Sequence, residues 1–383
     1  MSDQVHGLMA RGHEVAVWSP PAAAPLQPPA NEQRVPLAER RKTTLPGRVA
    51  DVLRGKDRLY ERHLAHAQAC ANAINDGKFD VLLAHPCVEQ YAPCIGGLVD
   101  CPSVLYLQEP NRHLFEFGDR SFIGCLEGGR GLKPRLARHL AVVEASEQAR
   151  REAVNARCYA RVLTNSYFSC ESITRAYGLT AWMARLGVDL CRFPHVERHR
   201  PVERAISVGA LVPGKGVDFI IRAVAASAGV RQLTWVANFA HRDFATRMHH
   251  LAAGLGVDFT LRLQVSDAEL VQELHASDVF LFAATLEPLG LAPLEGAATG
   301  LPVVAVNEAG PRESLPPECL SPRDVFAFAK SIDRLSADRS AARVAGLAAR
   351  RHVQQNWDLQ QALSGLESML AEIVLTCGGR SGR

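Results

Sequence analysis

The sequence predicts an α/β protein built from two domains, each with a parallel sheet. Short apolar runs bounded by turn residues alternate with helix-compatible segments, and this alternation is typical of parallel sheets covered by helices. The clearest case is residues 278–306, where an apolar run, a polar loop, a helix-compatible segment closed by Gly300 and a second apolar run follow one another. The length of 383 residues exceeds what a single hydrophobic core usually supports, so two domains are expected.

Composition and charge restrict the functional class. The chain is 47% hydrophobic and 22% charged, which is ordinary for a globular protein, and its net charge of +3 is too small to indicate nucleic-acid binding. No apolar run approaches the roughly 20 residues that span a bilayer, and the first residues lack the basic and apolar regions of a signal peptide. The ten cysteines form no C-x-x-C pair, which favours free thiols over a metal site or disulfides. We therefore expect a cytoplasmic protein.

The first half of the chain is predicted to alternate strands and helices. Ser2 is positioned to cap a first helix whose apolar residues share one face and which ends at Gly12. A strand follows from His13, and a Pro-rich loop covers residues 20–36. The remaining expected elements are a helix over 59–74, a strand over 79–84, a strand over 102–107, a helix over 144–160 and a strand over 161–166.

Residues 34–58 form a mildly basic stretch. Its basic residues are Arg34, Arg40, Arg41, Lys42, Arg48, Arg54, Lys56 and Arg58. Such a stretch is usually a solvated face of a domain. The alternative is a patch that touches anionic lipid, as an enzyme acting on membrane-bound acceptors would need.

Polar residues follow the strand predicted over 102–107. Gln108, Glu109 and Arg112 come at its carboxyl end, and His85 follows the preceding strand. Ligands bind beyond the carboxyl ends of strands in open α/β sheets, so these side chains are candidates for contact with a substrate. A structural salt bridge or a helix cap explains Glu109, Arg112 and His85 about equally well.

After a linker-like segment over 190–203, the second half repeats the alternation of strands and helices. Ser266 and Glu269 have the spacing of a capping box, which places the start of a helix between two of its strands. The predicted elements are a strand over 205–211, a helix after Gly216, a strand over 231–239, a helix over 242–255, a strand over 258–264, the helix after Ser266, the unit over 278–306 and a helical stretch over 325–373.

Two loops of the second half carry side chains suited to a phosphorylated sugar. Lys215, flanked by Gly214 and Gly216, can meet a diphosphate as a point charge, although such a lysine alone is more often a turn residue. In the second loop, Glu287 ends a strand where ligands bind in such sheets.

The residues after Glu287 prepare an anion site and a second carboxylate. Pro288 favours an extended backbone at Glu287, and Gly290 allows a ligand to approach the chain closely. The amides of residues 289–291 lie at the start of the coming helix, where an anion binds readily. Glu295, eight positions after Glu287, lies about one turn into that helix and can accept hydrogen bonds from sugar hydroxyls. Two solvated glutamates are the alternative for any isolated pair at this spacing.

The string EPLGLAPLE, followed by GLPVV, resembles the donor-site motif of the retaining glycosyltransferases of family 4, which have the GT-B fold. The strings ARGHEVAVWSP, YLQEPNRHLFE, AISVGALVPGKG and VNEAGPRESL resemble further segments of that family. The resemblance implies two Rossmann-like domains facing a central cleft, with a C-terminal helix that crosses back to the first domain. The implied boundaries are residues 1–188 for the acceptor-side domain, 189–350 for the nucleotide-sugar donor domain, and 351–383 for the crossover helix and a disordered tail.

The resemblance also implies transfer of a sugar, with retention of anomeric configuration, from a nucleotide-diphosphate sugar to a glycan, lipid or small-molecule acceptor in cell-surface polysaccharide or glycoconjugate synthesis. Glu295 would bind the ribose, Glu287 the donor sugar and Lys215 the diphosphate. The implied catalytic residues are Glu287, Lys215 and Glu109. The implied substrate-binding residues are Glu295, Pro288, Leu289, Gly290, Leu291, Gly214, Gly209, Glu308, Gly310, Gln108, Arg112 and Asn165. No metal or other cofactor is expected, and peripheral contact with the inner membrane surface would give access to lipid-linked acceptors.

The chain departs from the family pattern at several positions. Ala210 stands where an arginine is usual, which could cost about 1.5–3 kcal/mol of donor binding unless a cation such as Arg242 replaces it. Ala237 and Ala309 stand where glycines are usual, and the family's first strand and Gly-rich loop are not recognised, so we expect a chain shortened at its start. The alternative function is a catalytically degenerate GT-B protein that binds a nucleotide or partners another transferase. A nucleotide-sugar epimerase or a phosphorylase would keep the fold, although no motif for a phosphorylase's pyridoxal lysine is recognised.

Overall fold

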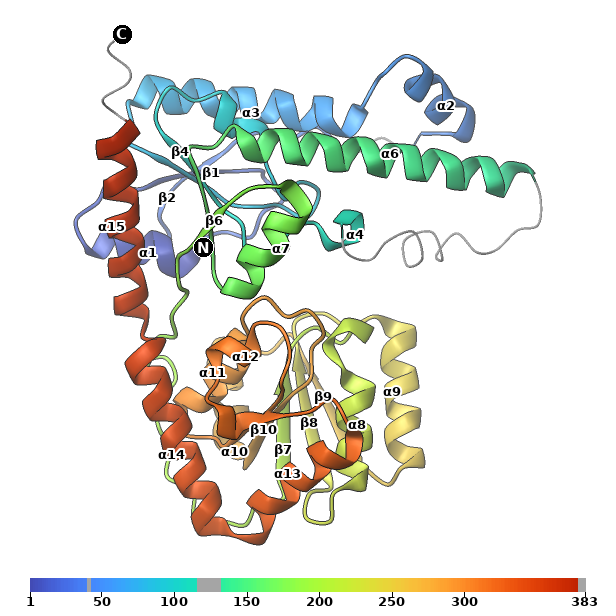
Figure 1. Ribbon diagram of the computed structural model, residues 1–383, viewed down its shortest axis with the longest axis vertical. Coiled ribbons are helices and arrows are strands. Elements are labelled where there is room, and N and C mark those ends of the chain that lie inside the picture. Colours follow the sequence, from blue (N-terminus) through green and yellow to red (C-terminus); the bar gives the residue numbers. More distant parts are fainter. Residues whose placement is uncertain (40–42, 116–131, 378–383) are drawn as a thin grey trace. The chain divides into compact units, whose positions relative to one another are not determined.

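The computed structural model describes residues 1–39, 43–115 and 132–377, and it divides into two compact units of parallel sheets and helices (Figure 1). The predicted α/β class with parallel sheets is confirmed. Three basic residues of the stretch over 34–58, Arg40, Arg41 and Lys42, lie outside the described residues, as does the tail after Cys377. The first unit comprises residues 1–165, 169–184 and 363–383, and the second comprises residues 166–168 and 185–362.

The first unit contains two parallel sheets. One has the strand order β3 (Leu82–Ala84), β4 (Ser103–Tyr106), β5 (Arg161–Thr164), β6 (Ala181–Met183), and the other pairs β1 (Ala16–Ser19) with β2 (Asn31–Arg34). Among the described residues, no strand pairs with the outer edge of β3 or with the second edge of β1. The helices of this unit are α1 (Ser2–Ala10), α2 (Leu45–Leu53), α3 (Arg58–Gly77), the 3-10 helix η1 (Cys94–Gly97), α4 (Arg112–Phe115), α6 (Leu132–Arg157), α7 (Tyr167–Tyr177) from its third residue, and α15 (Leu359–Cys377) from Leu363 onward.

Several elements of the first unit differ from the predicted ones. The loop expected over residues 20–36 contains the strand β2 (Asn31–Arg34), and the strand expected from His13 begins at Ala16. Ser2 is the first residue of α1 rather than its cap, which is Met1. β3 begins at Leu82, later than expected, and is correspondingly short. α6 begins at Leu132 rather than near Glu144, because Pro134 lies in its first turn, where a proline is tolerated since the backbone N–H has no helical partner.

The second unit is built on one six-stranded parallel sheet with the order β12-β11-β10-β7-β8-β9. Its strands are β7 (Arg204–Val208), β8 (Gln232–Ala237), β9 (Asp258–Leu263), β10 (Val279–Phe282), β11 (Val303–Val306) and β12 (Leu320–Ser321). Its helices are η2 (Pro213–Lys215), α8 (Val217–Ala226), α9 (Arg242–Gly254), α10 (Asp267–Ala276), α11 (Leu291–Ala298), α12 (Pro311–Ser314), η3 (Pro317–Cys319), α13 (Val325–Ala337), α14 (Arg339–Asn356) and the start of α15. The capping box of Ser266 and Glu269 at the start of α10 is confirmed.

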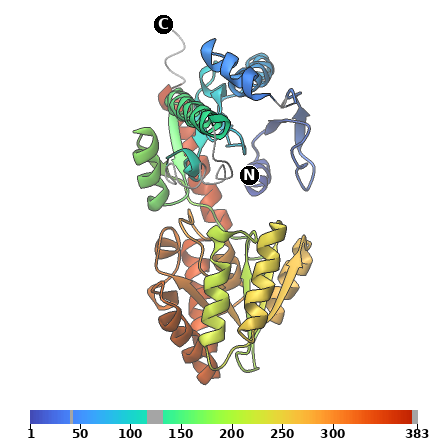
Figure 2. The ribbon, with the colours of Figure 1, turned by 90° about the vertical axis from the view of Figure 1, so that its right-hand side faces the viewer.

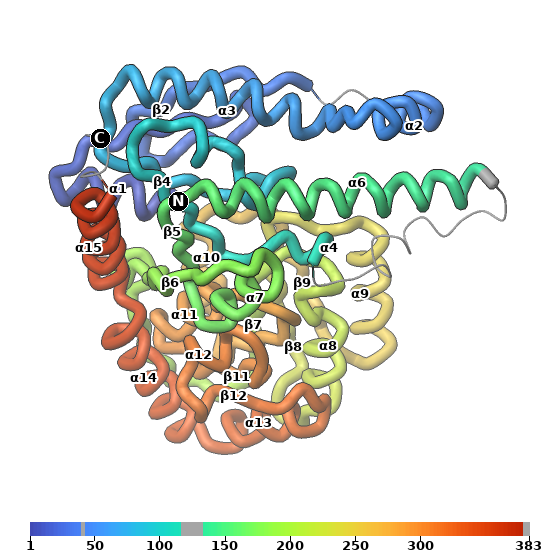
Figure 3. Tube along the Cα trace, turned by 45° about the horizontal axis from the view of Figure 1, so that its top comes forward, coloured from blue at the N-terminus to red at the C-terminus, as the bar shows by residue number. Residues whose placement is uncertain are grey.

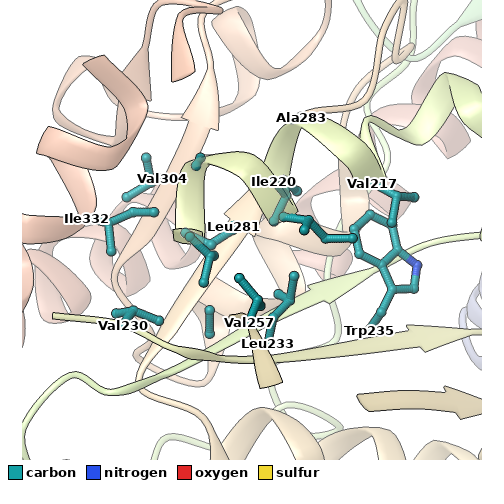
Figure 4. Close-up of a cluster of buried hydrophobic side chains, with 14 of the residues drawn as sticks. Val217, Ile220, Val230, Leu233, Trp235, Val257, Leu281, Ala283, Val304 and Ile332 are labelled. Atoms are coloured by element: carbon teal, nitrogen blue, oxygen red, sulfur yellow. The ribbon is translucent and has the colours of Figure 1, made fainter. Parts of the chain in front are cut away.

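Both faces of this sheet are covered by helices (Figure 2). Successive strand residues point to opposite faces, so Val279 and Leu281 of β10 join a core with α8, α9 and α13, in which Trp235 is also buried (Figure 4). Phe280 and Phe282 join the other core, with α10, α11 and α14. Strands covered on both faces are apolar throughout, which explains why β10 and β11 appear in the sequence as uninterrupted apolar runs.

The predicted helical stretch over 325–373 is divided into three helices that follow one another along the chain (Figure 3). Asp338 separates α13 from α14, because its carboxylate accepts hydrogen bonds from the backbone N–H groups of Ser340 and Ala341. Asp358 does the same at the start of α15, where it accepts from the first-turn amides of residues 360 and 361.

Candidate functional site

Three loops meet at one edge of the second unit's sheet. β7, β10 and β11 are adjacent and parallel, so the loops that follow them, residues 209–216, 283–290 and 307–310, emerge at the same edge. Carboxyl ends of parallel strands are where open α/β sheets bind ligands. These loops contain most of the residues that the sequence assigns to the donor site, and hydrogen bonds join them to one another.

Lys215 and Glu287 form an ion pair between the first two of these loops. Nζ of Lys215 donates to Oε2 of Glu287 at 2.6 Å, and the two side chains are 34% and 16% exposed. Because both remain open to solvent, the pair contributes no more than about 1 kcal/mol to stability. The pair places one cation and one carboxylate next to each other, as recognition of a phosphorylated sugar requires.

The amino end of α11 lies directly after Glu287 and provides backbone N–H groups. Gly290 is the N-cap with φ of 90°, a left-handed conformation that costs a glycine little, and no side chain caps the helix there. Leu286 also has a positive φ, 52°, which is costly for a bulky residue and has to be held by its surroundings. The amide dipoles, which no side chain caps, favour an anion at this helix end. Glu295 is half-buried in the second turn of the same helix.

The third loop and the helix α12 that follows it hold the second loop through two hydrogen bonds. The N–H of Gly310 donates to the carbonyl of Glu287 at 2.9 Å, and Oγ of Ser314 donates to the carbonyl of Leu289 at 2.7 Å. A Cβ placed on Gly310 would lie 2.2 Å from the carbonyl oxygen of Pro288, so only a glycine allows this approach. Gly310, predicted to contact substrate, thus has a packing role against residues 287–289.

The first loop is fixed by contacts that the sequence did not reveal. Thr285 donates to the carbonyl of Gly214 through its N–H at 2.9 Å and its hydroxyl at 3.0 Å. Nε1 of the buried Trp235 donates to the carbonyl of Gly209 at 2.8 Å. Gly216, with φ of 68°, packs so closely that a Cβ would lie 2.2 Å from the carbonyl oxygen of Ala283. These contacts set the position of Lys215.

Arg323 is a second cation near this edge. Its Nε donates to Glu308 at 2.7 Å, while its Nη atoms donate to the carbonyls of Ala283 and Ala284 at 3.0 and 3.1 Å. These donors are directed at Glu308 and at the residues after β10, so Arg323 joins the second loop to the third and fixes their positions. Glu308, predicted to bind substrate, is thereby paired with a cation.

Arg242 remains the candidate to replace the missing arginine at position 210. It is the first residue of α9 and is exposed. The segment just before it pairs with the first loop, since the N–H of Leu211 donates to the carbonyl of Phe239 at 2.8 Å. The backbone before Arg242 therefore lies close to Leu211, the residue after Ala210. That the Arg242 guanidinium replaces the missing arginine in phosphate binding stays a prediction.

The predicted acceptor-side residues lie in the first unit, after β4 and β5. Nε of the buried Arg112 donates to Oε2 of Glu109 at 2.6 Å, so the two form the structural salt bridge that the sequence left open as an alternative. Gln108 is exposed, with its carbonyl accepting from the hydroxyl of Thr164 at 3.5 Å. Asn165 is 2% exposed, and its Oδ1 has no hydrogen-bond partner among the residues that the structure describes.

Glu152 on α6 organises the segment around Arg112 and was missed by sequence reasoning. It is 1% exposed and accepts hydrogen bonds from Nδ2 of Asn111 at 3.3 Å and from the hydroxyl of Tyr177 at 3.1 Å. Burial raises the pKa of its carboxyl group, against the opposing effect of these hydrogen bonds. Nothing in the charged composition of this helix distinguishes Glu152 from its solvated neighbours, so no sequence signal pointed to it.

His85 follows β3, and the lowered pKa of its imidazole leads us to expect that the protein loses stability in acid. Burial lowers the pKa of its imidazole from 6.5 to about 4, with a smaller contribution from the amino terminus of the chain. A lowered pKa favours the neutral form in the folded state, so the contribution to stability is complete above about pH 6.5 and is lost as the pH falls towards 4. We expect the free energy of unfolding to fall by up to about 3 kcal/mol through this group. Denaturant titrations between pH 7 and pH 4 measure it.

The variant His85→Gln tests this prediction through the slope of stability against pH rather than its absolute level. The slope is expected to become shallower than in the wild type between pH 6.5 and pH 4. His250→Gln, at an exposed position of α9, is the matched control and keeps the wild-type slope. An unchanged slope in His85→Gln would contradict the assignment.

Within the described ranges, no group of three or more His, Cys, Asp or Glu side chains is arranged to hold a metal ion. The cationic and dipolar groups at the candidate site are instead Lys215 and the amides before α11. The site as built therefore offers fixed positive charge from the protein itself to a phosphorylated ligand.

Comparisons with known proteins agree with this chemistry. Residues 196–352 match the family model described as glycosyl transferases group 1. The lipopolysaccharide core biosynthesis glycosyltransferase LpsE of Rhizobium meliloti is 34% identical over 139 residues, which cover 35% of this chain and 40% of the relative. The D-inositol 3-phosphate glycosyltransferase of Salinispora arenicola is 30% identical over 227 residues, which cover 51% of this chain and 50% of the relative. The chain thus spans half or less of the length of these curated relatives.

The fold is also shared with solved structures. Sucrose-phosphate synthase from Thermosynechococcus elongatus superposes with a TM-score of 0.71 at 16% identity, covering 98% of this chain and 92% of that one. At this level of identity the likeness concerns the fold alone. The predicted GT-B fold is confirmed.

Proposed function

Because residues 196–352 match the family model described as glycosyl transferases group 1, we propose that this protein is a retaining glycosyltransferase. It transfers a sugar from a nucleotide-diphosphate sugar to a glycan, lipid or small-molecule acceptor, in the synthesis of cell-surface polysaccharide or glycoconjugate. The observation that carries the proposal is the pairing of Lys215 with Glu287, at 2.6 Å, beside the uncapped amino end of α11.

The leaving group of such a reaction is a nucleoside diphosphate, which gains negative charge as the bond to the sugar breaks. Lys215 and the amides of residues 289–291 are positioned to stabilise that charge, and fixed donors of this kind need no reorganisation in the transition state. Glu287 accepts hydrogen bonds from donor-sugar hydroxyls, and Glu295 from the ribose. No metal enters this scheme, because Lys215 and the helix dipole supply the positive charge.

Retention fits a reaction on one face of the sugar, in which the acceptor oxygen bonds to the anomeric carbon as the phosphate leaves. The leaving phosphate oxygen then takes the acceptor's proton. The protein's task is to hold the acceptor oxygen and the leaving phosphate on the same face of the sugar and to stabilise charge, so no carboxylate nucleophile is required. On the acceptor side, Glu109 and Arg112 have a positioning role in this proposal, because each side chain is held by the other in their ion pair.

We propose that this protein is a cytoplasmic enzyme that contacts the inner membrane surface, where lipid-linked acceptors are located. None of the described helices combines the length and apolar composition needed to cross a bilayer. In the basic stretch, Arg48 pairs with Glu144 and Arg58 with Asp51, so part of its charge is already neutralised. The exposed basic residues that remain next to α2 adjoin the apolar Leu53, which is 82% exposed. A cationic face with an exposed apolar side chain is suited to an anionic lipid surface.

The proposal is tested by thermal unfolding of the purified chain with UDP, GDP, ADP and dTDP, and with their sugar conjugates. We expect one nucleotide to raise the melting temperature selectively, because a ligand that binds only the folded state stabilises it. The shift should be abolished by Glu295→Ala and kept by the matched control Glu318→Ala, an exposed glutamate of η3. No shift with any nucleotide would rule out the donor site.

Ala210 favours a second candidate function, a degenerate GT-B protein that binds a nucleotide without transferring sugar. An alanine at this position offers no cation to the leaving phosphate, so binding could persist where catalysis does not. Turnover of the nucleotide sugar that gives the selective shift separates the two functions. Release of nucleoside diphosphate that depends on acceptor supports the enzyme, and binding without release supports the degenerate protein.

A further inference from the structure

We propose that the second unit carries a second anion site, for a phosphate group, at the opposite edge of its sheet from Lys215. A hollow of about 510 Å³, its open mouth included, lies between residues 195–202, the turn at 300–302 and the first two turns of α14. The turn at 300–302 precedes β11 and Asp278 precedes β10, so the hollow lies at the amino ends of these strands. It shares no lining residue with the loops at their carboxyl ends.

The lining carries an excess of positive charge. Its arginines are Arg198, Arg200, Arg339 and Arg343, and its acids are Glu197 and Asp278. Asp278 is 3% exposed and already satisfied by Nε of Arg200 and by two backbone N–H groups, at 3.2 and 2.9 Å. Glu197 is exposed and pairs with His199 at 3.1 Å. Two positive charges are therefore left without an acid in the wall, a balance that attracts an anion.

The arginines differ in how many of their N–H groups are available. Arg198 directs its guanidinium at the ends of α10 and α11, donating to the carbonyls of Leu274 at 3.0 Å and Thr299 at 2.8 Å, so it forms part of the wall. Nη1 of Arg339 donates to the carbonyl of His199 at 2.6 Å, and the other N–H groups of Arg339 remain available to a ligand. Arg343 has no hydrogen-bond or ion-pair partner within the described part of the chain.

Arg339 and Arg343 are four positions apart on α14, so their side chains share one face of the helix. Two guanidinium groups on one face can hold the oxygens of one phosphate, for which the planar fork of arginine is suited.

Two glycines allow the chain to pack closely around the hollow. A Cβ on Gly300 would lie 2.4 Å from Nδ1 of His195, and a Cβ on Gly346 would lie 2.1 Å from the carbonyl oxygen of Gly300. The hollow is thus closed where α14 closely approaches the turn after α11. The helices α11 and α14 lie side by side (Figure 1). The available guanidinium groups of Arg339 and Arg343 suit one phosphate group, as in inorganic phosphate or a small sugar monoester.

The test has to separate this site from the candidate donor site, because phosphate binds to lysine and helix amides as well. Lys215→Ala is therefore the background, in the full chain. Inorganic phosphate is titrated into it by isothermal calorimetry, with sodium chloride adjusted to constant ionic strength. The further change Arg343→Gln is expected to weaken phosphate binding about tenfold. Arg351→Gln removes the same charge from an exposed position of the same helix outside the hollow and is expected to leave binding unchanged.

Arg339→Gln provides an independent second variant with the same expected loss. Glucose 6-phosphate, titrated in parallel, distinguishes the two sources of the phosphate group, since tighter binding than that of inorganic phosphate identifies a sugar monoester. Equal affinities in the Arg343→Gln and Arg351→Gln proteins, or no phosphate binding in the Lys215→Ala background, would overturn the proposal. Neither result bears on nucleotide binding at the carboxyl edge of the sheet.

Discussion

Replacing Lys215 by alanine is expected to lower kcat/KM for sugar transfer at least a hundredfold. The ammonium group lies 2.6 Å from Glu287, and the amino end of α11 follows directly after that residue. Removing one preorganised donor that stabilises developing negative charge typically costs a factor of about 10² to 10³. The stability cost should be small, because the lost ion pair is 34% and 16% exposed at its two side chains. Steady-state kinetics with the nucleotide sugar identified by thermal unfolding measures the loss.

The matched control for this change is Lys330→Ala, which removes the same charge from an exposed position of α13. It should leave both kinetics and melting temperature near wild-type values. Glu287→Gln adds a second comparison, since it keeps the side-chain shape and removes the carboxylate that pairs with Lys215. If Lys215→Ala transfers sugar as fast as Lys330→Ala, the diphosphate is held by other groups and the assigned role is wrong.

Much of the second unit could be predicted because its signals are local. β10 and β11 are covered on both faces, so each is a short apolar run between turn residues. The capping box of Ser266 and Glu269 lies within four residues and is visible in the sequence. The break at Asp338 was missed because an aspartate within a helix-compatible stretch is as readily a solvated residue as a cap.

Contacts between distant segments were beyond sequence reasoning. The motif around Glu287 indicated the loops of the candidate site, but not that Gly310 supports the loop or that Trp235 anchors Gly209. These contacts join residues that are far apart in the chain, and no spacing rule relates them. The buried Glu152 shows the same limit, since its hydrogen-bond partners Asn111 and Tyr177 lie on other segments.

The variant Gly310→Ala tests whether the loop over residues 307–310 sets the shape of the loop over residues 283–290. Its Cβ would lie 2.2 Å from the carbonyl oxygen of Pro288 and 2.5 Å from Cα of Leu289, both backbone atoms that no rotamer change can move. The φ of Gly310 is −62°, so an alanine there suffers no conformational strain and the clash is the whole effect. We expect Gly310→Ala to lower the free energy of unfolding by about 1–3 kcal/mol, as overpacking does. The dissociation constant of the selected nucleotide should rise at least tenfold, because the loop carrying Glu287 and the α11 amides has to shift.

Gly254→Ala is the matched control for Gly310→Ala, because a Cβ at this last residue of α9 meets no atom within 4 Å. Its expected change in stability is within about 0.5 kcal/mol, with unchanged nucleotide affinity. Denaturant unfolding and calorimetric titration of the nucleotide separate the two consequences at Gly310. A loss of stability with wild-type affinity would mean that the strain is absorbed in α12 and does not reach the loop. Loss of both would show that the close approach of Gly310 holds the anion-binding amides in place, since no side chain of Gly310 exists to touch the ligand.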